Sequence, residues 1–289
     1  MDGPALAMGI SFALMWSSAF ATARIIVAQA PPLMALSLRF LIAGLIAVAI
    51  ARLMGQSWSL TPGQRRSVIV FGLCQNALYL GLNFVAMQWI EASLAAIIAA
   101  SMPLIVALLG WILAGDRVPR LGILGLAAGM LGVGLIMGTR ISGGADPMAV
   151  GLCVLGALAL AVATRTVRSA SAGGNLVMIV GLQMLVGAAA LGGVSAFFET
   201  ATVIWTPSLI LAFAYQILVP GLAATLIWFA LVGRIGPVRA STFHFLNPFF
   251  GVTVAALLLG ERIGALDIIG VAVAAAGILA VQIARLQTD

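Results

Sequence analysis

The 289-residue chain is 63% hydrophobic and 8% charged, with a formal net charge of +6. A soluble domain usually carries about 25% charged residues, so this composition excludes a protein whose surface faces water on all sides. All fourteen basic residues are arginines spread singly or in pairs between apolar runs, which excludes the clustered basic face of a nucleic-acid-binding protein.

The unbroken length of the apolar runs indicates the fold class. Backbone polar groups in lipid must be satisfied within the protein, which leaves helical bundles and closed β-barrels. Barrel strands alternate apolar and polar residues, and this chain does not, so we predict an all-α membrane protein. Cys74 and Cys153 both lie inside apolar runs and cannot form a disulfide framework or a zinc site. We expect no metal and no cofactor.

Ten apolar runs follow one another along the chain, each about 20 residues long and therefore able to cross a bilayer as a helix. The N-terminus has neither a basic region nor a cleavage site, so the first run is read as a retained helix. Turn residues such as Pro31-Pro32 and Thr61-Pro62-Gly63 separate the runs, and no loop is long enough for a second domain. The predicted spans are residues 4–27, 33–54, 67–89, 92–114, 120–139, 147–168, 175–198, 208–232, 238–259 and 264–285.

The distribution of arginines predicts the orientation. If the N-terminus is cytoplasmic, ten arginines fall on the cytoplasmic side and four fall at or toward the outer side. Cytoplasmic loops carry an excess of basic residues, so both termini are predicted to be cytoplasmic. The four arginines toward the outer side are Arg24, Arg39, Arg140 and Arg262.

The second half of the chain repeats the first with an offset of 145 residues. Pro103 aligns with Pro248, and residues 115–117, Gly-Asp-Arg, align with residues 260–262, Gly-Glu-Arg. Each half holds five spans, so the second half enters the membrane from the opposite side. We predict two inverted five-helix repeats, residues 1–140 and 141–289. Such repeats are typical of alternating-access transporters, whose solute site lies near the midplane between the halves.

Three motifs resemble the drug/metabolite transporter superfamily, in its ten-helix branch with two EamA-type repeats. They are MWSSAF at residues 15–20, LSLRFLIAG at residues 36–44, and the two prolines that are each followed by G-[DE]-R. Within that branch the chain looks most like the YddG-type exporters of aromatic amino acids and amphipathic toxic compounds. The resemblance implies a bacterial-type inner-membrane exporter with both termini inside.

A histidine, an asparagine and a proline interrupt the ninth apolar run. Proline has no N–H and clashes with the carbonyl four residues back, so Pro103 and Pro248 predict hinge-like bends at equivalent places. His244 and Asn247 are three residues apart and share a helical face. Polar residues are costly in lipid, so we expect both to line a central solute cavity. The alternative is that His244 bonds a neighbouring helix and holds the bundle together.

Further candidates for solute binding lie in other spans. Asn76, Tyr79 and Asn83 form a polar stripe on the third span, for which interhelical hydrogen bonding is the alternative. Trp16 could stack on a ring or a cation, and ordinary packing is its alternative. The predicted solute-binding residues are Trp16, Ser17, Asn76, Tyr79, Asn83, Ser101, Met102, Trp228, His244 and Asn247.

The residues missing from the middle of the spans indicate the solute. All eight acidic residues fall in tails, loops or first turns, so only His244 could carry a proton. Arginines are also absent from mid-depth, which disfavours solutes with phosphate groups. The cavity suits an aromatic or large apolar amino acid, or an amphipathic cation. We expect the protein to export such a solute down the solute's own concentration gradient.

Other functions stay open. The chain could be a proton-coupled exporter of drugs or other metabolites, or a passive channel, although a channel has less need of an inverted repeat. A membrane enzyme would need an acid near His244, and none is predicted at that depth, so we do not expect an enzyme. Small residues on the fifth and tenth spans allow close packing within one bundle or between two protomers of a homo-oligomer. They are Gly125, Gly129, Gly132, Gly270, Ala274 and Gly277.

Overall fold

The computed structural model describes residues 3–114, 119–166, 175–236, 240 and 242–286, and all regular structure in these residues is helical. Nine helical runs among them are long and apolar enough to cross a membrane, and α8 is a tenth apolar helix. The predicted class, an all-α membrane protein of two five-helix repeats, is confirmed. The first five spans are α1 (Gly3–Val27), α2 (Pro32–Leu53), α3–η1–α4 (Pro62–Phe71, Gly72–Tyr79, Leu80–Ala86), α5–α6 (Ala92–Ala100, Met102–Ala114) and α7 (Arg120–Ser142). The second five are α8 (Pro147–Thr166), α9 (Leu176–Phe198), α10–η3–α11 (Pro207–Gln216, Ile217–Ala223, Ala224–Ile235), η4–α13 (Thr242–Leu246, Asn247–Leu259) and α14 (Ala265–Leu286).

The third span starts at Pro62, earlier than the predicted residue 67. The residues Thr61-Pro62-Gly63, which were predicted to form a turn, start the helix instead. Thr61 is the N-cap: its Oγ1 accepts from the Gln64 backbone N–H at 3.3 Å, and the Gln64 side chain accepts from the Thr61 N–H at 3.0 Å. Pro62 occupies the first turn, where a missing N–H costs nothing.

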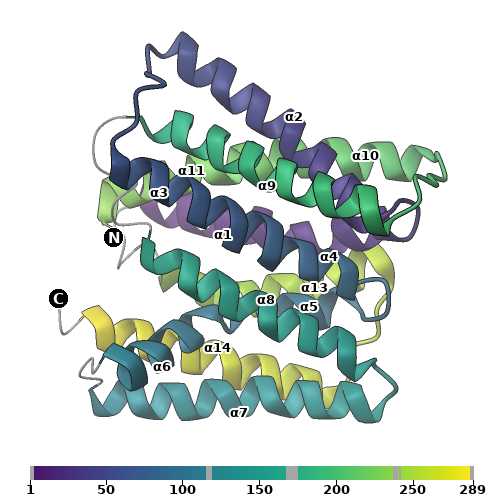
Figure 1. Ribbon diagram of the computed structural model, residues 1–289. Helices are drawn as coiled ribbons and strands as arrows, with labels where there is room; N and C mark the ends of the chain where they lie inside the picture. Colours follow the sequence, from purple (N-terminus) through teal and green to yellow (C-terminus); the bar gives the residue numbers. More distant parts are fainter. Residues whose placement is uncertain (1–2, 115–118, 167–174, 237–239, 241, 287–289) are drawn as a thin grey trace.

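Equivalent helices of the two repeats pair with each other. The two most extensive helix pairings in the described part of the chain are α7 with α14 and α2 with α9, on opposite sides of the bundle (Figure 1). A methyl group added at Gly132 would lie 2.7 Å from the Ala274 nitrogen, and one added at Gly125 would lie 2.8 Å from the Ala280 Cβ. Residue numbers therefore rise along α7 as they fall along α14, so the pair is antiparallel, as inversion requires.

Helix α1 begins and helix α14 ends at the same end of the bundle (Figure 1). We call this end the terminal end and the opposite end the far end. In the far half, buried residues of helices from both repeats form one continuous core. In the terminal half, the described core residues fall into separate clusters. One joins α1, α11 and η4 through Ala5, Leu231 and Phe243, and another joins α6 to α8. The two repeats thus share one continuous core in the far half, and in the terminal half they contact each other through several smaller clusters.

Candidate functional site

Four rings meet where the first repeat contacts the second, and we call them the ring cluster: Phe12 and Trp16 of α1, Trp228 of α11 and His244 of η4. The Phe12 ring lies 4.6 Å from Trp228, 5.5 Å from His244 and 5.7 Å from Trp16, centroid to centroid. Trp228 and His244 are 5.3 Å apart. These separations are in the range of favourable ring contacts. The structure therefore brings together three of the predicted residues, Trp16, Trp228 and His244, around the Phe12 ring.

The side-chain amide of Asn247 adjoins the ring cluster. The Asn247 Nδ2 lies 3.0 Å from the His244 Nδ1, as their three-residue spacing predicts. The Ser17 hydroxyl donates to the backbone carbonyl of Asn247 at 3.3 Å. The other polar atom of the amide, Oδ1, is buried with no hydrogen-bond partner. Leaving a buried acceptor unsatisfied costs about 1–3 kcal/mol. The amide therefore keeps one unused acceptor beside the ring cluster.

Both repeats interrupt a helix beside the predicted proline. In the first repeat the helix breaks at Ser101, between α5 and α6, and Pro103 follows. In the second, the 3-10 helix η4 ends at Leu246 and Pro248 lies in the first turn of α13. Ser101 and Leu246 are equivalent under the 145-residue offset. Ser101 itself donates to the Ile98 carbonyl at 2.6 Å, and Met102 packs on the far-half core.

The polar stripe of the third span faces other helices instead of the ring cluster. The Asn76 side chain donates to the Gln183 carbonyl of α9 at 2.9 Å, which is the interhelical bond considered as the alternative. Asn83 donates to the Tyr79 carbonyl at 2.8 Å, and Tyr79 is buried in the far-half core. A methyl group at Gly156 of α8 would lie 3.1 Å from that carbonyl, so α8 covers it. A role for these three residues in solute binding stays a prediction.

Arg39, which was predicted to lie at or toward the outer side, is buried in the protein interior. Only 5% of the residue is exposed, and its Nε donates to the Gln216 carbonyl at 3.3 Å. Gln216 directly precedes the π-helical segment η3, so this bond joins Arg39 of α2 to the start of η3. The position of Arg39 in the sequence gave its depth, about 10 Å along the helix from the start of the span. It did not give the face of the helix on which the side chain lies.

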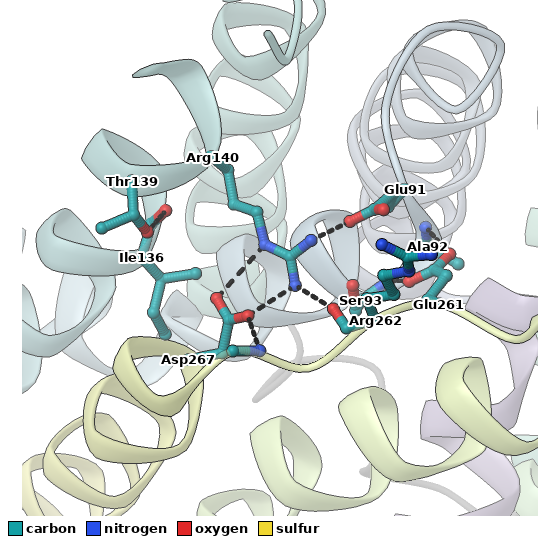
Figure 2. A network of polar contacts seen from close by, with 10 residues as sticks. Glu91, Ala92, Ser93, Ile136, Thr139, Arg140, Glu261, Arg262 and Asp267 are labelled. Carbon is teal, nitrogen blue, oxygen red and sulfur yellow. Dashed lines mark hydrogen bonds and ion pairs between the residues drawn. The ribbon is translucent and has the colours of Figure 1, made fainter. Parts of the chain in front are cut away.

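Charged side chains tie the repeats together at the far end (Figure 2). Arg140 of α7 pairs with Glu91 of the first repeat and with Asp267 of α14, at 2.8 Å for the latter. The Glu261 carboxylate accepts from the backbone N–H groups of Ala92 and Ser93 at 2.7 and 3.0 Å, at the N-terminus of α5 (Figure 2). An anion there is favoured by the helix dipole. This set of contacts is the far-end network.

Glu91 is the titratable group of this network with a perturbed proton affinity. Partial burial raises the pKa of its carboxyl group above the usual value of 4.5, and the nearby Glu261 and Asp267 carboxylates act in the same direction. The Arg140 guanidinium opposes this increase. The sequence placed Glu91 in a loop but could not indicate that three separate loops and helix ends converge on Arg140.

Known proteins resemble the chain along most of its length. Residues 3–138 and residues 147–282 each match the EamA-like transporter family. The uncharacterized transporter YvbV of Bacillus subtilis is 23% identical over 255 residues, which cover 86% of this chain and 81% of YvbV. The uncharacterized inner membrane transporter YedA of Escherichia coli K12 is 28% identical over 266 residues, covering 89% and 82% of the two chains.

A protein of known crystal structure has the same fold, with a TM-score of 0.68 over 100% of both chains and 22% identity. The fold likeness and the two family matches agree with the pairing of equivalent helices described above. The chain belongs to the EamA-like transporter family and is a multi-pass membrane transporter.

Proposed function

We propose that the protein exports aromatic and large apolar amino acids, and related amphipathic compounds, by alternating access down the solute gradient. The terminal end faces the cytoplasm in this proposal, because ten of the fourteen arginines were assigned to that side. The membrane is the bacterial inner membrane. The observed conformation is then closed toward the outside, where the core is continuous, and its terminal half is where solute enters.

The observation that carries this proposal is the ring cluster with its unsatisfied amide. Trp16 comes from the first repeat and Trp228 and His244 come from the second, so the site lies at the junction that an inverted-repeat transporter opens and closes. Ring faces favour a flat apolar side chain, and the neutral Asn247 amide and Ser17 hydroxyl suit an amphipathic solute.

Counterflow in proteoliposomes tests the proposal. Vesicles with purified protein are loaded with unlabelled L-phenylalanine, and entry of labelled L-phenylalanine is followed against protein-free vesicles. We expect saturable entry that is faster with phenylalanine inside than without it. Entry that is linear in concentration and indifferent to internal solute would indicate a channel, and absence of entry for aromatic amino acids would reject the solute class.

Proton coupling through His244 is the second candidate, because this imidazole is the chain's only one and belongs to the ring cluster. The same vesicles are tested with an imposed pH gradient and no solute gradient. Accumulation of phenylalanine or of a planar cation that His244→Gln abolishes would favour a proton-coupled exporter. Equilibration without accumulation favours facilitated export.

A further inference from the structure

We propose that Arg39 binds the carboxylate of the transported solute. The inference rests on the proposed function and adds the chemical group that the solute must carry. It concerns a side chain that lies outside the ring cluster, on a helix that contributes no ring to it.

The guanidinium of Arg39 is almost fully enclosed, yet most of its donors are unused. The Nε–H donates to the Gln216 carbonyl, and the Cζ atom lies 5.0 Å from the centre of the Phe40 ring. Neither Nη nitrogen donates to an acceptor in the part of the chain that the structure describes. A single neutral carbonyl does not balance the charge of the group.

No described carboxylate serves as a counter-ion. Glu91 and Asp267 pair with Arg140, and Glu261 caps α5. Glu199 accepts from the backbone N–H groups of Leu33 and Met34 at 2.9 and 2.8 Å, and Asp146 accepts from Met148 at 2.7 Å. Within the described residues, every acidic side chain is therefore engaged elsewhere.

A buried charge of this kind implies a partner that arrives from outside the chain. An arginine at the centre of a membrane helix costs about 2.5–3.5 kcal/mol on insertion scales, so such residues usually face the site of transport. The planar fork of the guanidinium matches a carboxylate in a bidentate geometry. The unused Nη donors of Arg39 are the ones that such a pair employs.

Hydrogen bonds through Gln216 link Arg39 to α1, the helix that carries Phe12 and Trp16. The Gln216 side chain, whose backbone carbonyl Arg39 binds, donates to the Ala19 carbonyl at 2.6 Å and to Thr22 at 2.9 Å. Ala19 is three residues beyond Trp16, so it lies about 4.5 Å further along the axis of α1. The Gln216 Oε1 is buried without a partner and suits an ammonium donor.

The alternative is that Arg39 only holds α2 against the Gln216 carbonyl at the start of η3. That task needs one donor, which glutamine can also supply, and it makes no demand on the solute. The two roles therefore differ in whether a solute that lacks a carboxylate is discriminated against.

The test compares matched solutes on the wild-type protein and on Arg39→Gln. Inhibition of phenylalanine counterflow is measured with L-phenylalanine and with L-phenylalaninamide. Thermal unfolding of the purified protein is measured with 3-phenylpropionate and with the neutral 3-phenylpropionamide, in chloride and in gluconate buffer. We expect the carboxylate compounds to act at about tenfold lower concentration on the wild type, since hydrogen bonds to charged groups are the strong ones. The ratio should fall to about one in Arg39→Gln.

The control is Arg24→Gln, which removes another arginine of the far half and should keep the wild-type ratio. Wild-type protein that does not prefer the carboxylate compounds, or that chloride stabilises as well as 3-phenylpropionate does, overturns the assignment even if Arg39→Gln fails to fold. Counterflow without a carboxylate preference rejects only the role of Arg39. Absence of counterflow together with absence of stabilisation rejects the proposed function as well.

Discussion

At the scale of single residues, Trp228 is the ring-cluster residue best suited to a substitution test. Its ring contacts both Phe12 and His244, at 4.6 and 5.3 Å. It is partly buried, as a residue that borders a solute site should be. Trp89, at the far end of the third span, is 56% exposed and provides a matched control.

We expect Trp228→Leu to raise the half-saturating concentration of phenylalanine in counterflow by about three- to tenfold, because one aromatic contact is worth about 0.5–1.5 kcal/mol. Trp89→Leu should leave that concentration unchanged. Equal effects of the two substitutions, or no effect of Trp228→Leu in a protein that still unfolds at the wild-type temperature, would remove Trp228 from the solute site.

The residues of the ring cluster differ in how visible they were in the sequence. His244 and Asn247 stood out because polar groups are rare in apolar spans, and their spacing of three gave the observed contact. Phe12 was missed, since a phenylalanine in an apolar run carries no signal of its own. Arg39 was noticed, but its burial and its contact with Gln216 were not predicted, because they depend on which neighbouring helix it faces.

At the scale of elements, the two interrupted helices are where the bundle can change shape. Pro248 separates the 3-10 turn that carries His244 from the regular helix α13. Alanine at this position restores an N–H and allows an α-helix to continue through residue 246. The interruption, and with it the setting of His244, should then become stiffer.

We expect Pro248→Ala to lower the maximal rate of counterflow several-fold while the affinity for phenylalanine, measured by thermal stabilisation, changes less. Pro207→Ala, in the first turn of α10 and away from either interruption, should alter neither. A loss of affinity as large as the loss of rate would mean that the bend is static and only shapes the site.

Element boundaries were predictable to within a turn in most spans, because apolar length is set by the bilayer. The exception at Thr61 arose because proline and threonine signal both turns and helix N-termini. The π-helical segments η1 and η3 had no counterpart in the prediction. The segment η3 contains Pro220, so a proline was visible there, but the way the backbone absorbs it depends on tertiary packing.

At the scale of the whole molecule, the antiparallel pair α7–α14 joins the repeats through small residues. A methyl group at Gly277 would lie 2.4 Å from the Gly129 nitrogen and 2.5 Å from its Cα, both backbone atoms that cannot move aside. At Gly134, on the same helix pair, a methyl group would meet nothing within 4 Å.

We expect Gly277→Ala to destabilise the protein by about 1–3 kcal/mol, the usual cost of overpacking, and so to lower its unfolding temperature in detergent. Gly134→Ala should unfold within experimental error of the wild type. Unchanged stability in Gly277→Ala would mean that α7 and α14 do not approach as closely as the structure has them.

The repeat was legible from the sequence because its markers, two prolines and two G-[DE]-R triplets, are uncommon residues at one constant offset. The conformation was not legible. Which end is closed depends on contacts between residues far apart in the chain, such as Arg140 with Asp267 and Glu261 with the first turn of α5.

The central claim of the proposed function is that the far end, where the far-end network joins the repeats, has to open for the solute to leave. Glu91 and Arg262 belong to different repeats and both contact the Arg140 guanidinium, so cysteines at these two positions can be joined by a short cleavable thiol cross-linker (Figure 2). Cys74 and Cys153 are first replaced by alanine, and modification with a monofunctional reagent serves as the control. We predict that cross-linking stops phenylalanine counterflow and that cleavage restores it. Full counterflow through completely cross-linked protein would contradict the account.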